Sequence, residues 1–304
     1  MYSEFLFFIM NIGVYGIWGI PLEDFKKQYI NKLFSDKDIK LNDDICLYNL
    51  NDVNLIGDRI ETNKLKNLIS STSKTDFNIP VIRFSMESEA NRYRKHNRNI
   101  IDQFFNEIKH KYYVGYFNEV YNVCHKIYFP FWLSFHEDLI KYYNKNYNNF
   151  EERYENWICD MTSNRSVTWR ERFYKNIQSK RIETKFGRYS YNDRENKIDV
   201  ISKYLFNACF ENTFEYGYVT EKPAEALMGG CLPIYNGLFN NKELNPFNMD
   251  KFFIVKEKDM NTYNSQTFTK IDKLFLQDKF ILPILKNNYK DIIDELLNSV
   301  HLKL

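Results

Sequence analysis

Short apolar runs alternate along this chain with segments whose apolar residues recur at helical spacing, and this alternation restricts the fold more than any other feature. Apolar runs bounded by polar or turn-forming residues are typical of buried strands. In the first half such strands are predicted at Phe7–Met10, Val53–Gly57, Pro80–Met86 and Tyr112–Tyr116. Helices are predicted between them at residues 22–34, 65–69 and 100–108. This order predicts an α/β fold with parallel sheets.

The same alternation resumes after a polar stretch. Residues 142–149 contain no aliphatic side chain, so we predict a surface linker there and a domain boundary near residue 150. Trp157–Met161 starts a second α/β run, Ile201–Phe210 leads into a strand, and further strands are predicted at Cys231–Tyr235 and Phe252–Val255. Helices are predicted at 169–177, 220–230 and within 281–304. Two α/β domains, 1–150 and 151–304, would then face a cleft at the carboxyl ends of their strands, where open α/β sheets bind ligands.

The apolar N-terminal run allows two interpretations. Phe5–Ile20 is shorter than the roughly 20 residues that span a membrane, and Gly13, Gly16 and Gly19 interrupt it. No basic residue precedes it, as a signal peptide would require. We interpret it as a buried parallel strand entering a Gly-rich turn, with a short membrane anchor as the alternative. The expected location is therefore cytoplasmic or membrane-peripheral, with no stable membrane span.

Charge and cysteine content exclude several classes of protein. Lys and Arg number 42 and Asp and Glu number 40, so the chain lacks the basic excess of a nucleic-acid-binding protein. The five cysteines are scattered and lie mostly in apolar segments, which favours buried free thiols and a reducing compartment. They are Cys46, Cys124, Cys159, Cys209 and Cys231. No clustered ligands indicate a metal site, and the single Asp36-Lys37-Asp38 match lies in a polar stretch.

The segment Cys209–Gly237 carries the most informative pattern. Thr220 is a good helix N-cap, and Pro223 is tolerated in a first helical turn. Gly229 and Gly230 suit the end of that helix. Lys222 would lie in the first turn, where the helix dipole disfavours a cation and attracts an anion. A phosphate bound beside Lys222 would explain its position, and a solvated surface lysine is the alternative.

Three short motifs of this segment resemble the signature of the α1,3/4-fucosyltransferase family (glycosyltransferase family 10). They are Phe210-Glu-Asn212, Tyr218-Val-Thr-Glu-Lys222 and Pro233-Ile-Tyr-Asn-Gly237. Upstream, Ser163-Asn164 followed by Arg170 is similar to another family segment. In the first half, Ser85-Met-Glu-Ser88 resembles the loop that carries the family's proposed base.

The resemblance implies a GT-B type fold of two Rossmann-like domains, with the donor bound in the second. It implies transfer of L-fucose from GDP-fucose to a glycan hydroxyl, with inversion at the anomeric carbon and an α1,3-type linkage. Arg170 and Lys222 match the family's phosphate-binding pair. Asn212, Tyr218 and Glu221 match its other donor contacts. Pro223 departs from the aliphatic residue usual there.

Inverting transfer needs a base for the acceptor hydroxyl and positive charge for the departing diphosphate. Glu87 follows an apolar strand and is the predicted base, with Glu89 as the local competitor. Arg170 and Lys222 would supply the charge, so no metal is required and a divalent ion would at most stimulate. Two alternatives stay open: the same fold using another nucleotide sugar, and a relative that binds glycan or nucleotide without turnover.

Overall fold

The computed structural model divides the chain into two compact units. The first unit comprises Met1–Pro130 with Leu297–Leu304, and the second comprises Phe131–Leu296. The structure describes residues 9–15, 21–34, 38–43, 51–57, 62–71, 79–85, 104–115, 125–146, 153, 158–161, 170, 173, 176, 180–181, 197–237, 245–259, 262–263 and 285–300.

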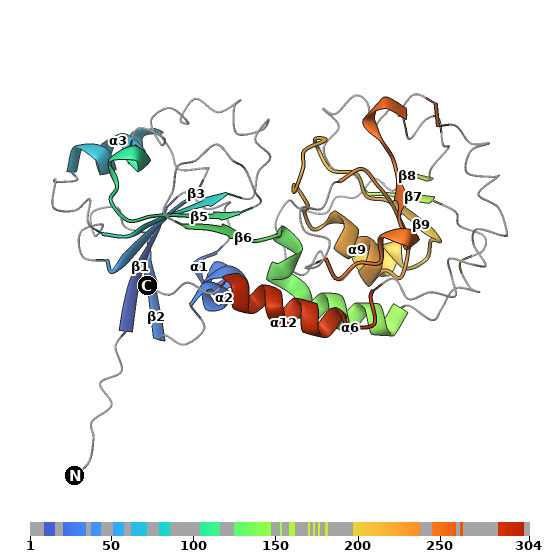
Figure 1. The fold of residues 1–304 in the computed structure, drawn as a ribbon, viewed down its shortest axis with the longest axis horizontal. Coiled ribbons are helices and arrows are strands. Elements are labelled where there is room, and N and C mark those ends of the chain that lie inside the picture. The colour runs from blue at the N-terminus through green and yellow to red at the C-terminus, as the bar shows by residue number, and fades with distance from the viewer. Residues whose placement is uncertain are drawn as a thin grey trace, which may run out of the picture. The chain divides into compact units, whose positions relative to one another are not determined.

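The first unit contains a six-stranded parallel sheet (Figure 1). Its strands are β1 (Ile9–Tyr15), β2 (Asp38–Asn42), β3 (Val53–Gly57), β4 (Val81–Ser85), β5 (Lys111–Gly115) and β6 (His125–Tyr128). They lie in the order β2-β1-β3-β4-β5-β6, and each neighbouring pair is parallel. The predicted strands of the first half are confirmed. The N-terminal apolar run contains β1, and the Gly-rich turn predicted after it lies outside the described residues.

The helix predicted at 22–34 is present, and its middle turn is wider than an α-helical turn. It consists of α1 (Leu22–Phe25), a π-helical turn η1 (Lys26–Ile30) and α2 (Asn31–Leu33). Its aromatic side chains enter the core, where Phe25 and Tyr29 both lie edge-on to Phe84 of β4 at centroid distances of 5.4 and 5.1 Å. Helix α3 (Thr62–Ser71) follows β3. The amphipathic spacing thus predicted which face packs on the sheet.

The second unit repeats the strand connectivity of the first. Its strands are β7 (Ile158–Asp160), β8 (Lys180–Arg181), β9 (Phe206–Ala208), β10 (Leu232–Tyr235) and β11 (Phe253–Ile254). Their order is β11-β10-β9-β7-β8, again with parallel pairs. In both units the first strand lies between the second and the third, so the strand order reverses there. Ligands bind at the carboxyl ends of the strands beside such a reversal, here β7 and β9.

Helices of the second unit include η4 (Phe131–Phe135), α6 (His136–Asn146), α9 (Lys222–Met228), η6 (Met249–Lys251), η7 (Glu257–Asp259) and α12 (Tyr289–Val300), whose last residues belong to the first unit. Helix α6 contacts α9, and the Asn146 side-chain amide donates to the Met228 carbonyl oxygen at 2.7 Å. Because α6 packs there, the chain divides after Pro130, earlier than the boundary predicted near residue 150.

The surface linker predicted at residues 142–149 is wrong for its first part. Residues 142–146 complete α6, and Tyr142 and Tyr143 are buried. A tyrosine buries its ring readily when its hydroxyl finds a partner, and the Tyr143 hydroxyl accepts a hydrogen bond from the Leu285 backbone at 3.4 Å. A polar composition therefore concealed a packed helix.

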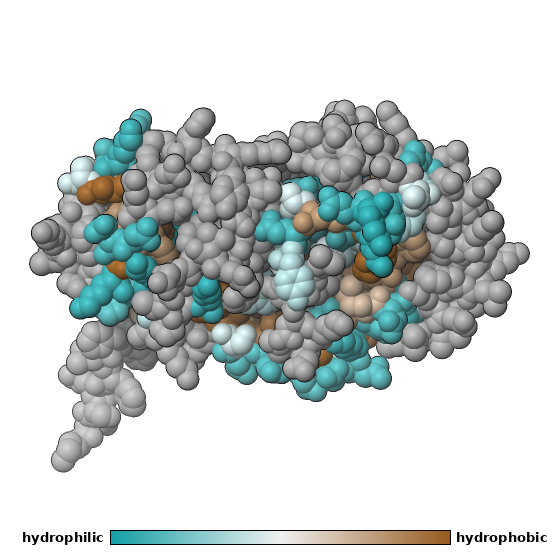
Figure 2. All heavy atoms as spheres, turned by 45° about the horizontal axis from the view of Figure 1, so that its top comes forward, coloured by the Kyte–Doolittle hydropathy of each residue, from teal (hydrophilic) through white to brown (hydrophobic). Residues whose placement is uncertain are grey.

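Hydrophilic residues cover most of the coloured surface in Figure 2, and the hydrophobic ones form small patches. The described residues include two large hydrophobic side chains that are clearly exposed, Ile9 and Tyr216. Within the described part of the chain, no helix is both long and apolar enough to cross a membrane. The predicted helix at 169–177 lies largely outside the described residues.

Gly230→Ala should destabilise the second unit. Gly230 follows α9 with φ 69°, and a Cβ built there would lie 2.7 Å from the Asn146 carbonyl oxygen. A left-handed backbone costs an L-residue about 1–2 kcal/mol before the clash is added. We expect the unfolding free energy to fall by about 2 kcal/mol or more in denaturant titration, whereas Lys258→Ala on the surface changes it by less than about 0.5 kcal/mol. Equal stability of the two variants would contradict this packing.

Candidate functional site

A fully buried carboxylate lies just beyond the carboxyl end of β9. Glu211 has no exposed surface, and its backbone N–H donates to the Asn236 side-chain oxygen at 2.7 Å. Asn236 itself follows β10, the neighbouring strand. Glu211 is thus fixed at the edge of the sheet where its fold class binds ligands.

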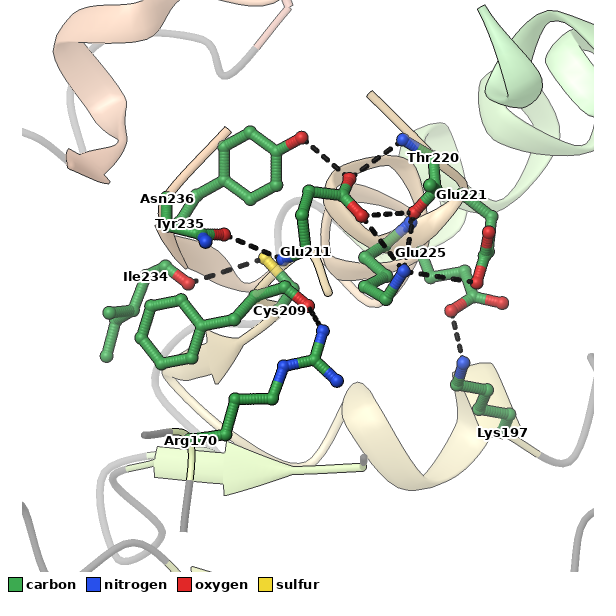
Figure 3. Close-up of polar contacts among 12 residues, drawn as sticks. Arg170, Lys197, Cys209, Glu211, Thr220, Glu221, Glu225, Ile234, Tyr235 and Asn236 are labelled. Carbon is green, nitrogen blue, oxygen red and sulfur yellow. Dashed lines mark hydrogen bonds and ion pairs between the residues drawn. The ribbon is translucent and has the colours of Figure 1, made fainter. Parts of the chain in front are cut away.

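Four hydrogen bonds converge on the Glu211 side chain (Figure 3). Oε1 accepts from the Thr220 backbone N–H and the Tyr235 hydroxyl, both at 2.8 Å. Oε2 accepts from the Thr220 hydroxyl at 2.8 Å and from the Lys222 ammonium at 2.9 Å. A carboxylate offers about four acceptor positions, and every partner here is a donor. The arrangement fits an ionised Glu211 whose charge Lys222 balances.

The Lys222 ammonium is held in place by the same cluster. Its Nζ donates to the Thr220 hydroxyl at 2.7 Å as well as to Glu211, and it lies 3.8 Å from Glu221 Oε1. Burial lowers the pKa of Lys222, but the carboxylates of Glu211 and Glu221 outweigh burial and the nearby Arg170, so its pKa is raised. The side chain is 21% exposed. Lys222 is therefore a charged and oriented ammonium on a partly exposed side chain.

Arg170 binds the backbone of Phe210, the residue that precedes Glu211. Its guanidinium donates to the Phe210 carbonyl oxygen, and only 1% of the residue is exposed. The Phe210 ring packs edge-on against Phe173 at 4.7 Å, which fixes this stretch of backbone. Phe210 and Glu211 thus hold both cations that the sequence predicted as a pair, one by a carbonyl and one by a carboxylate. Lys222 is the more accessible of the two.

The structure describes three of the remaining predicted site residues and not the others. Asn212 is half-buried directly after Glu211, Tyr218 is buried, and Glu221 approaches Lys222. Four residues predicted to contact the sugar donor, Asn212, Tyr218, Glu221 and Lys222, therefore lie within the segment 210–222 that follows β9. Glu87, Glu89 and Ser163-Asn164 lie outside the described residues, so their positions stay predictions.

Thr220 is not the N-cap of the helix, contrary to the sequence prediction. Helix α9 begins at Lys222, and Glu221 occupies the cap position without a side-chain capping bond. The Thr220 hydroxyl accepts a long 3.5 Å bond from the Lys222 backbone N–H and bonds more closely to the side chains of Glu211 and Lys222. Charge-assisted hydrogen bonds of this kind are stronger than a neutral capping bond. Because α9 has only seven residues, charged side chains rather than its dipole dominate the local field. Pro223 in the first turn and Gly230 after the end are confirmed.

Sequence reasoning missed Glu211. Its partners Thr220, Lys222 and Tyr235 are far from it in the chain, and no local spacing brings them together. One available signal was an acidic residue directly after an apolar strand, since a charge there is either exposed or specifically paired.

The described cysteines are inert packing residues. Cys159, Cys209 and Cys231 are free and buried, which confirms the prediction for these three. Burial raises the pKa of all three thiols, that of Cys231 to about 12. Among the described residues, no group of three or more His, Cys, Asp or Glu side chains could hold a metal ion. Asp36 and Lys37 of the weak Asp-x-Asp match lie outside this part of the chain.

Solved structures of known proteins share this fold. A crystal structure of an α1,3-fucosyltransferase with GDP matches with a TM-score of 0.60 and 18% identity, over 100% of this chain and 95% of that one. A crystal structure of an α1,3-fucosyltransferase with GDP-fucose matches with a TM-score of 0.58 and 18% identity, over 97% and 91%. The predicted α/β fold of GT-B type, with parallel sheets in two Rossmann-like units, is confirmed.

Sequence comparison finds similarity to one family. Residues 150–295 match the model described as glycosyltransferase family 10 (fucosyltransferase) C-term. The alpha-(1,3)-fucosyltransferase FucT of Helicobacter pylori is 34% identical over 141 residues, which cover 44% of this chain. The chain spans only 26% of the length of that curated relative. Residues 150–295 are thus similar to glycosyltransferase family 10, and the resemblance stated from the motifs is confirmed.

Tyr235→Phe should lower the unfolding free energy of the second unit, because it removes one hydrogen bond to Glu211. The substitution removes one donor to a buried carboxylate, and a hydrogen bond to a charged group contributes about 1.5–3 kcal/mol. We expect the unfolding free energy of the second unit to fall by that amount in denaturant titration. Tyr216→Phe, at a side chain that is 61% exposed, is the matched control and should be nearly neutral. A neutral Tyr235→Phe would show that Glu211 does not depend on this donor.

Proposed function

We propose that this protein transfers L-fucose from GDP-fucose to a hydroxyl of a glycan acceptor, with inversion and an α1,3-type linkage. The observation that carries the proposal is the oriented Lys222 ammonium at the carboxyl end of β9, with Arg170 held on the adjoining backbone. The similarity of residues 150–295 to glycosyltransferase family 10 and the GDP and GDP-fucose bound by fucosyltransferases of the same fold support it.

In this proposal the second unit binds the donor. Lys222 contacts a phosphate oxygen and stabilises the negative charge that grows on GDP as the glycosidic bond breaks. Arg170 is buried, so it adds positive charge nearby and keeps Phe210 in place. Asn212, Tyr218 and Glu221 make the other donor contacts. Because two side chains supply the positive charge, the reaction requires no metal, although a divalent ion can stimulate it.

The first unit supplies the base. β4 ends at Ser85, and Glu87, two residues further, would accept the proton of the acceptor hydroxyl. Glu89 is the competing candidate. We expect a glycan acceptor, no nucleic-acid partner, and a cytoplasmic or membrane-peripheral location.

Two other functions use the same residues differently. The same fold could transfer a sugar from another nucleotide, in which case the site would prefer a nucleobase other than guanine. A relative without turnover would bind nucleotide or glycan and release no product. A panel of nucleotide sugars, with products identified by mass spectrometry, separates these possibilities.

GDP should raise the melting temperature of the protein, and UDP should do so much less. A ligand that binds only the folded state stabilises it by about 2.7 kcal/mol at a hundred times its Kd. Differential scanning fluorimetry with both nucleotides at equal concentration makes the comparison. Equal shifts for GDP and UDP would exclude a site specific for GDP.

Lys222→Ala should weaken GDP binding by roughly 10- to 100-fold, because a charge-assisted contact to phosphate contributes about 1.5–3 kcal/mol. Isothermal titration calorimetry measures the change, and Lys203→Ala, which removes an exposed lysine of the same unit, is the matched control. Unchanged affinity in Lys222→Ala would place the phosphates elsewhere.

Arg170→Ala should lower both the affinity for GDP and the stability of the fold. The buried guanidinium bonds to the Phe210 backbone, so its loss lowers both GDP affinity and the melting temperature. Affinity is therefore compared only at temperatures where circular dichroism shows that the variant is folded.

Glu87→Gln should lower turnover by about 10²–10⁴-fold, since it keeps the side-chain shape and removes the proton acceptor. GDP affinity should barely change, because Glu87 belongs to the first unit. Glu89→Gln is the matched control and should be mild. Loss of turnover in Glu89→Gln alone would assign the catalytic base to Glu89 instead of Glu87. Full turnover in both variants would mean that another residue is the base.

A further inference from the structure

We propose that Glu211 is a positioning residue for sugar transfer, whose buried carboxylate holds the Lys222 ammonium where it meets the donor diphosphate. This inference rests on the proposed function and assigns a role to a residue outside the predicted site. The cluster consists of Glu211, Thr220, Lys222 and Tyr235.

A lysine needs such an anchor more than an arginine does. Its ammonium is a point charge on a flexible four-carbon stem, so fixing it costs side-chain entropy each time a ligand binds. Here two of its three N–H donors are already engaged, by Glu211 at 2.9 Å and by Thr220 at 2.7 Å. Among the residues that the structure describes, the next carboxylate is that of Glu221 at 3.8 Å, an ion pair longer than a hydrogen bond. A ligand oxygen can therefore accept the third N–H. The ammonium is thus oriented before the donor arrives.

A purely attractive anion site would not contain Glu211. Its negative charge opposes the binding of a diphosphate, so the advantage that it gives is orientation rather than attraction. The carboxylate also joins three separate segments: the end of β9, strand β10 through Tyr235, and the start of α9 through Lys222. It therefore fixes the lysine relative to the sheet and not only relative to its own helix.

The same unit contains a matched pair without this connection. Glu225 of α9 is buried and forms an ion pair with Lys197. Both pairs join a buried glutamate to a partly exposed lysine, and only the Glu211 pair includes a proposed donor contact. Glu225→Gln therefore also removes a buried carboxylate that pairs with a lysine, without touching the proposed site.

The first experiment compares Glu211→Gln with Glu225→Gln in the full chain, at a temperature where both are folded by circular dichroism. Glu211→Gln should lower kcat/KM for GDP-fucose by about 10- to 100-fold, whereas Glu225→Gln should stay within about 2-fold of the wild type. Equal kcat/KM in the two variants would reduce Glu211 to a stabilising residue and overturn the proposal.

A double-mutant cycle tests whether Glu211 acts through Lys222. If it does, adding Glu211→Gln to Lys222→Met should lower kcat/KM by less than about 2-fold further, since residues acting as a unit are not additive. Independent, additive losses would contradict a positioning role.

Thr220 provides a second test should Glu211→Gln not fold. Thr220→Val removes the hydroxyl that joins Glu211 to Lys222, and Thr220→Ser keeps it. We expect Val to lower kcat/KM by about 10-fold and Ser to retain it, and equal values for the two would overturn the proposal. A wild-type protein that binds no GDP and transfers no fucose would refute the proposed function itself. Normal wild-type transfer with unaffected variants would refute only the role of Glu211.

Discussion

The buried charge of Glu211 is the constraint on which the rest of the site depends. An ionised carboxylate without exposed surface is unfavourable by several kcal/mol unless it is paired and fully hydrogen-bonded. Four donors meet this requirement, and they come from the loop after β9, from α9 and from β10. Satisfying one carboxylate therefore fixes the loop that carries Tyr218 and Glu221, the first residue of α9, and the lysine proposed to meet phosphate.

The fold supplies the place where this cluster is useful. Both units share one strand order, and in the second the order reverses between β7 and β9. Glu211 lies just past the end of β9, and Arg170 reaches the residue before it. A parallel sheet exposes its carboxyl ends to ligand at such a reversal, so the cations lie where a nucleotide would be expected. The helix dipole is a small contribution here because α9 is short.

The sequence predicted the parts of the fold that local patterns encode, and missed those that depend on distant partners. Apolar runs located every strand except β2, β6 and β8, and the spacing of Phe25 and Tyr29 located the helix that packs on β4. Composition failed at α6, because tyrosines count as polar in a local reading and yet bury their rings. For the site, the motif identified Lys222 and Arg170. The motifs also contain Glu211 and Tyr235, but the sequence could not reveal that these two side chains meet, because Tyr235 lies on another strand.

The most direct measurement is a crystal structure of the protein with GDP. The account predicts that Lys222 Nζ lies at about 2.7–2.9 Å from a phosphate oxygen, the usual length of a charge-assisted bond. It also predicts that Lys222 keeps its bond to Glu211 in that complex. GDP bound with its phosphates away from Lys222, or a Lys222 that leaves Glu211 to reach them, would contradict the account.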